Sequence, residues 1–150
     1  MGERYGTVGN QATNTTTSKT MLVLTGSTTL IFKIYDFMMG CDGTPADGVF
    51  VYEAQRTTAA GTSTSATPEP LDVTHALVAE ATAGVNHTAE PTTAGSIMIA
   101  IPANARASYR WQAAPGGELW SSRAASNGFA FRSRSPALTL STRCTVHHEE

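Results

Sequence analysis

The sequence predicts an all-β protein, an antiparallel β-sandwich or jelly roll of about eight short strands with at most one short helix. Short apolar segments with a period of two recur along the 150 residues, and loops rich in Gly, Pro and Thr separate them. Only one segment is compatible with a helix. No internal repeat at a fixed period is visible, which argues against a solenoid or a propeller. These observations favour two packed antiparallel sheets.

The first half of the chain contains three of the expected strands. Residues 1–20 are polar and rich in Gly, Asn and Thr, with no period that would bury one face, so we expect a flexible arm. Order begins with a strand at 21–25, and a turn through Gly26 leads into a second strand at 28–37. The segment GCDGTPADG is dense in turn residues and predicts a loop, after which 49–57 form a third strand.

The second half begins with a long polar loop, expected at 58–69. Residues 72–83 form either a short helix with Asp72 as N-cap or an irregular segment. Pro102 ends a buried strand at 96–101 or places it at a sheet edge. Later strands are expected at 105–113, 118–122, 129–135 and 137–146, with an Asn127-Gly128 hairpin turn before the third of these. One domain therefore spans 21–147, and 148–150 form a polar tail.

The strand at 28–37 is apolar on both of its faces. Leu30, Phe32 and Ile34 alternate as a half-buried strand requires, yet the intervening positions are also mostly apolar. Such a strand lies either in the centre of the sandwich or with its second face against a partner, and Val49 and Val51 repeat the pattern. Leaving these side chains in water would forgo about 1.5 to 3 kcal/mol each. The candidate interface residues are Ile31, Tyr35, Phe37, Val49, Val51 and, on composition alone, Trp120.

Charge is scarce in this chain. Only 15% of its residues are charged, against about 25% in an ordinary domain, and the net charge is −2. Nucleic acid and anionic membranes are therefore not expected as partners. A surface of hydroxyl and methyl groups can be covered by protein without stranding charges, which suits a component of an assembly, although secreted adhesins and lectins share this profile. No signal peptide and no membrane span is recognisable, so we expect a soluble protein made in a cytoplasm.

No group of residues predicts catalysis or a cofactor. His75 and His87 lie in polar segments, but no nucleophile elbow accompanies the many serines, and we expect solvated loop histidines and no enzyme. The terminal HHEE cannot converge on one metal ion, because adjacent side chains on a strand point to opposite faces. Cys41 and Cys144 either pair or remain reduced thiols.

Three segments carry a resemblance to a known class of proteins. They are KIYDFMMGCDGTPADGVFVYEAQRTTAAGTSTSATPEPLD, NHTAEPTTAGSIMIAIPANARASYRWQAAPGGELW and ASNGFAF. Together they resemble the small virion structural proteins of tailed bacteriophages, which include capsid decoration (cement) proteins and other minor head components. The similarity covers roughly residues 28–146. The polar arm and the HHEE tail depart from it.

The resemblance implies a β-sandwich that commonly forms trimers on the outside of an icosahedral shell. There it would clamp neighbouring major capsid subunits. The implied partners are other copies of the chain, with a homotrimer favoured, and the major capsid protein. The implied location is the exterior of a virion assembled in a bacterial host.

Two alternatives remain open. One is a carbohydrate- or receptor-binding sandwich displayed on a virion, with Tyr109, Arg110 and Trp111 as an exposed aromatic shelf. The other is a different minor structural protein of the head or tail.

Overall fold

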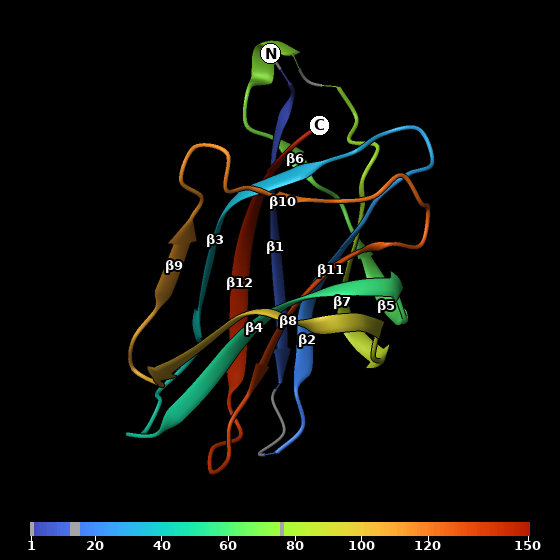
Figure 1. Cartoon of the computed structure of the whole chain (residues 1–150). Coiled ribbons are helices and arrows are strands. Elements are labelled where there is room, and N and C mark those ends of the chain that lie inside the picture. Colours follow the sequence, from blue (N-terminus) through green and yellow to red (C-terminus); the bar gives the residue numbers. More distant parts are fainter. Residues whose placement is uncertain (1, 13–15, 76) are drawn as a thin grey trace.

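The computed structural model describes residues 2–12, 16–75 and 77–150, and it confirms the predicted antiparallel β-sandwich (Figure 1). These residues contain twelve strands and one 3₁₀ turn, but no α-helix. The elements are β1 (Arg4–Ala12), β2 (Lys19–Thr25), β3 (Lys33–Cys41), β4 (Val49–Ala59), β5 (Thr62–Ala66), β6 (Glu69–Pro70), η1 (Val73–His75), β7 (Thr82–Ala89), β8 (Thr92–Asn104), β9 (Tyr109–Gln112), β10 (Leu119–Trp120), β11 (Gly128–Arg134) and β12 (Ser141–Glu149).

The strands form two sheets that enclose one aromatic core. Sheet A has the order β10-β3-β12-β1-β6, with β9 also paired to β3, and sheet B has the order β5-β7-β2-β11-β4-β8. Phe32 and Phe37 come from sheet A and its flank, and they meet Phe129 and Phe131 of sheet B. Burial of these rings accounts for the packing of the two layers.

The expected flexible arm is wrong for Arg4–Ala12. This segment is β1, and all nine of its residues pair with β12. Tyr5 and Thr7 are buried, so the strand needs few apolar residues to fill its inner face. Backbone hydrogen bonds to β12 stabilise it, and a composition argument does not detect these bonds. Residues 13–15 of the expected arm lie outside the described residues.

A β-bulge in β3 explains why the strand is apolar on both faces. Phe37 pairs with Val146 and Asp36 with His147, but the next pair joins Ile34 to His148. Tyr35 is thus an extra residue, and inward and outward positions exchange across it. Ile34 and Phe37 therefore share the core face, although the strand period predicts opposite faces. Phe37 is 1% exposed, so its predicted role at a subunit interface is wrong.

Sheet B curls on itself, which buries part of its second face. Two-residue connections join β4 to β5 and β7 to β8, although these strands lie near opposite ends of the sheet order. Val23, Ala130 and Gln55 form one row across β2, β11 and β4, on the face away from sheet A, and all three are buried. The sheet therefore contributes a second, smaller buried layer.

Several expected boundaries also change. The polar loop at 58–69 contains the edge strand β5, and the segment at 72–83 is the irregular alternative with only the short η1. The strand expected at 28–37 begins at Lys33, and the last strand continues to Glu149. The predicted Asn127-Gly128 hairpin is wrong, because β10 and β11 belong to different sheets. Pro102 lies in β8 at the edge of sheet B, as one alternative required, but the expected burial of 96–101 is wrong, because these residues are exposed or half-buried.

Candidate interaction surfaces

An exposed apolar loop joins β6 to β7. Within eight residues, Leu71, Val73, Leu77 and Val78 have exposed fractions of 52%, 83%, 63% and 89%. In Figure 1 the loop lies at the end of the sandwich where the two chain ends also lie. We call residues 71–75 and 77–78 the apolar loop. Exposed apolar groups gathered in this way are typical of a surface that binds another molecule.

Hydrogen bonds fix the apolar loop at both of its ends. At its start, the Leu71 N–H donates to the Arg4 carbonyl at 2.8 Å, and within the loop Asp72 Oδ1 accepts bonds from the backbone N–H and the hydroxyl of Thr74, at 2.9 and 2.6 Å. The Tyr5 hydroxyl donates to the Leu77 carbonyl at 3.3 Å. Beyond the loop, the Glu150 carboxylate accepts the N–H groups of Glu80 and Ala81 at 2.9 and 2.8 Å. The apolar side chains of the loop are therefore exposed although its backbone is hydrogen-bonded to the rest of the sandwich.

The polar tail expected at 148–150 is instead part of this tether. His148 is fully buried, and its ring stacks on Tyr5 with centroids 5.4 Å apart. Its Nε2 lies 3.3 Å from Glu150 Oε1. Burial of Glu150 raises the pKa of its carboxyl, but hydrogen bonds from His148 and two backbone N–H groups outweigh burial and leave that pKa below its usual value.

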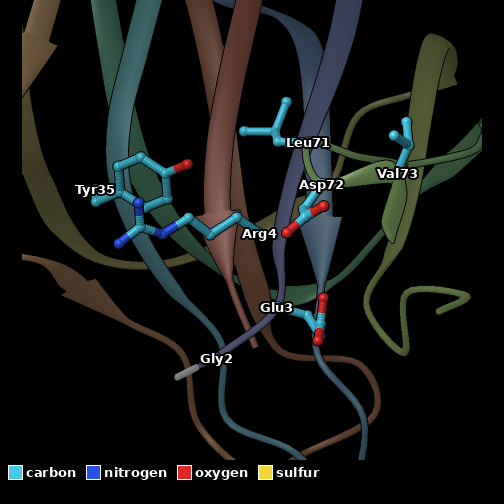
Figure 2. A pocket seen from close by; sticks show the side chains of 7 residues that line it. All are labelled: Gly2, Glu3, Arg4, Tyr35, Leu71, Asp72 and Val73. Carbon is cyan, nitrogen blue, oxygen red and sulfur yellow. The ribbon is translucent and has the colours of Figure 1, made fainter. Parts of the chain in front are cut away.

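A cavity of about 610 Å³ lies between the start of the apolar loop and the outer face of sheet A (Figure 2). Leu71 and Val73 form its apolar lining, and Glu3 and Asp72 contribute carboxylates. The Arg4 guanidinium stands 5.5 Å from the centre of the Tyr35 ring. The cavity is large enough to receive side chains of a partner, and its size falls in the range of binding sites.

Charged groups on the outer face of sheet A are paired with one another. Glu149 lies 3.2 Å from Arg4 and 2.9 Å from Lys33. Asp36 accepts two bonds from Arg110, at 2.9 and 2.8 Å, and lies 3.0 Å from His147 Nδ1.

These contacts also set the charge states of the two carboxyls. The Arg110 bonds hold the pKa of Asp36 below its usual value despite partial burial. Burial raises the pKa of Glu149, but its bonds to Lys33 and Arg4 lower it more. Such mutually satisfied carboxylates are ionised and suit a structural network better than acid–base chemistry.

The remaining predicted interface residues are divided between the two sheets. Trp120 on β10 is 50% exposed, and the Lys33 ammonium stands 5.5 Å from its ring centre. Val49 begins β4 and is exposed, whereas Ile31, Tyr35 and Val51 are half-buried. Tyr35 stacks on His147 on the outer face of sheet A. Trp120 pairs with Lys33, two residues before Tyr35, so Trp120 and Tyr35 share the outer face of sheet A, whereas Val49 and Val51 belong to sheet B.

The aromatic shelf proposed for a carbohydrate does not form. Trp111 packs against the core and stacks on Phe37, with ring centroids 5.0 Å apart. Arg110 is held by Asp36, and strand alternation directs it away from Tyr109 and Trp111. Tyr109 is half-buried. The three side chains therefore do not converge on one exposed ligand.

Other residues considered for chemistry are held in ways that suppress reactivity. Cys41 and Cys144 are free thiols, and burial raises the pKa of both. His87 is buried in β7 and is not the solvated loop residue we expected. The side chain of His75 lies outside the described residues. Within the described part of the chain, no group of three or more His, Cys, Asp or Glu side chains could hold a metal ion.

Sequence reasoning missed Tyr5, His148 and Glu150 because each lies in a polar terminal segment. The apolar loop had a detectable pattern, since DVTHALV places apolar residues in a segment without strand alternation. Among the described residues, no helix has the length and apolar character needed to cross a membrane. Comparison of the chain with protein families, curated proteins and solved structures found no match.

Proposed function

We propose that this chain is a structural protein of a phage virion that decorates the icosahedral capsid and stabilises it by bridging major capsid subunits. The sandwich fold is the one that the sequence resemblance implies. The observation that carries the proposal is the group of exposed apolar side chains in the apolar loop, at the end of the sandwich where the two chain ends lie (Figure 1).

A bridging protein needs at least two contact surfaces, because it must touch two subunits at once. Contacts at separate places on one rigid body combine their affinities through effective concentration. The low charge of the chain, 15% of residues, also lets its surface be covered at little desolvation cost. The paired carboxylates of the outer face and the two thiols, one half-buried and one buried, favour this structural role over catalysis.

We also propose that the chain forms a homo-oligomer, with a trimer favoured. Phe37 no longer supports this, because it belongs to the core. Trp120 does support it, since half of a large aromatic side chain remains exposed on the short strand β10. Size-exclusion chromatography with light scattering should give three times the 15.8 kDa chain mass. A strict monomer at high protein concentration would contradict the oligomer.

The decisive test uses expanded capsid shells of the parent phage prepared without this chain. The purified chain should cosediment with these shells and saturate at a fixed ratio to the major capsid protein. It should also raise the temperature at which the shells disrupt, because a ligand that binds only the intact shell stabilises it. Shells that bind none of the chain at high excess, and disrupt at an unchanged temperature, would overturn the proposed function.

A further inference from the structure

The loop between β6 and β7 differs from the other exposed apolar positions in its density. Its four large apolar side chains lie within eight residues, whereas Val8, Met38, Val49, Ile97 and Trp120 are scattered over five strands. Single exposed apolar residues are normal on protein surfaces, but a contiguous group calls for an explanation.

Hydrogen bonds restrain the backbone of the apolar loop in the chain by itself. The Thr74 bonds to Asp72, the Tyr5 hydroxyl on the Leu77 carbonyl and the Glu150 carboxylate together restrain the segment. Ordering a free loop on association would cost conformational entropy. A tethered loop avoids part of that cost.

The charges around the apolar loop are mainly acidic. Glu69 and Asp72 flank Leu71 in the chain, and Glu3 lines the same cavity as Leu71 and Val73. Glu80 lies two residues after the loop, and its carboxylate accepts bonds from Ser27 and Thr29. Arg4 also lines the cavity, but its guanidinium is engaged by Glu149 and by the Tyr35 ring.

The pKa of the Tyr5 phenol reflects the same acidic surroundings. Burial raises its pKa, and the carboxylates of Glu150, Glu3 and Glu80 raise it further. An anionic lipid surface would be repelled by this end of the molecule. A second copy of the same end would be repelled for the same reason. Lysine or arginine on a protein partner would instead be attracted.

We propose that the apolar loop and the adjoining cavity are the site where the chain docks on a shell protein, at an apolar hollow edged by lysine or arginine. Leu77 and Val78 enter the hollow, and the carboxylates of Glu3 and Asp72 face its basic edge. The assignment of the partner to the shell rests on the proposed function. The apolar loop and its acidic surroundings are observed independently of that function.

The test compares matched variants on the expanded shells described above. The double variant Leu77→Ser with Val78→Ser should bind at least about 100-fold more weakly, because two aliphatic side chains would no longer be buried in the hollow. The control Val8→Ser removes a similarly exposed side chain from β1 and should bind as the unmodified chain does. Because all three positions are exposed, the melting temperatures of both variants should match that of the unmodified chain.

The charge contribution is measured with Glu3→Lys and with salt. Glu3→Lys should weaken binding, and the affinity of the unmodified chain should fall as salt rises. Vesicles of neutral and of anionic lipid are the second probe and should retain neither the chain nor its variants.

Equal shell binding by the double variant and the unmodified chain would overturn the docking site while leaving the proposed function intact. Failure of the unmodified chain to bind shells would overturn both. Retention on lipid vesicles, lost in the double variant, would overturn the assignment to a protein partner.

Discussion

The middle of β3 buries its apolar side chains, whereas the apolar loop between β6 and β7 exposes them. In β3, one extra residue at Tyr35 turns Ile34 and Phe37 to the same face, and both are buried. In the apolar loop, Val73 and Val78 are exposed to solvent, although both are as apolar as core residues and the loop backbone is hydrogen-bonded to Tyr5. An apolar pattern therefore indicates burial only together with the local backbone geometry.

Replacing Phe37 by alanine should give the largest effect of the changes considered. The ring packs between Trp111 and Phe131, at centroid distances of 5.0 and 5.2 Å. Its removal leaves a cavity, so the free energy of unfolding should fall by about 3 to 5 kcal/mol. Denaturant titration measures this change. A loss below about 1 kcal/mol would mean that Phe37 lies at the surface, as the strand period suggested.

Glu150→Ala should have an intermediate effect that is local to the tether. The substitution leaves the N–H groups of Glu80 and Ala81 and the His148 ring without their carboxylate partner. A loss of about 1 to 3 kcal/mol in the free energy of unfolding is expected. Hydrogen exchange at residues 77–81 should be faster in the variant than in the unmodified chain, whereas exchange in β3 should not change. Unchanged exchange at residues 77–81 would contradict the proposed restraint of the apolar loop.

Lowering the pH should reduce the free energy of unfolding through His87, by less than the Phe37→Ala substitution does. Burial lowers the pKa of His87 in the folded chain, although Glu90 acts in the opposite direction. Below about pH 6.5, the unfolded chain takes up a proton that the folded chain resists, so stability falls as the pH falls. Denaturant titrations from pH 7.5 to 5 should show this slope. The His87→Gln variant should flatten it, and an unchanged slope would show that other groups dominate.

Val78→Ser should give the smallest effect on folding. The side chain is 89% exposed, so the free energy of unfolding should change by less than about 0.5 kcal/mol. Thermal or denaturant unfolding measures it beside Phe37→Ala under the same conditions. A loss comparable to that of Phe37→Ala would show that the apolar loop belongs to the core, which would remove the contrast drawn above.

The sequence predicts the fold class because alternation survives in β4 and β12, where Phe50, Tyr52, Cys144 and Val146 face the core. It does not predict β1 or β5, because Arg4–Ala12 and Thr62–Ala66 are stabilised by backbone pairing more than by side-chain burial. It also misplaces Phe37, since a bulge changes parity without a distinctive residue at Tyr35.

The tether of the apolar loop lies beyond what local patterns can show. Tyr5, Leu77 and Glu150 are far apart in the chain and meet only when β1 and β12 are side by side. Trp120 was selected on composition and is half exposed, but nothing in its neighbouring residues indicates how it packs.

The pairing of Glu3 with Glu150, through N–H to carbonyl bonds at 3.1 and 2.9 Å in both directions, also has a practical consequence for labelling. A fluorescent protein or affinity tag fused to either terminus would stand next to the apolar loop and would obstruct any shell protein arriving there. The turn at 42–48, at the other end of the sandwich, is the better position for an inserted reporter.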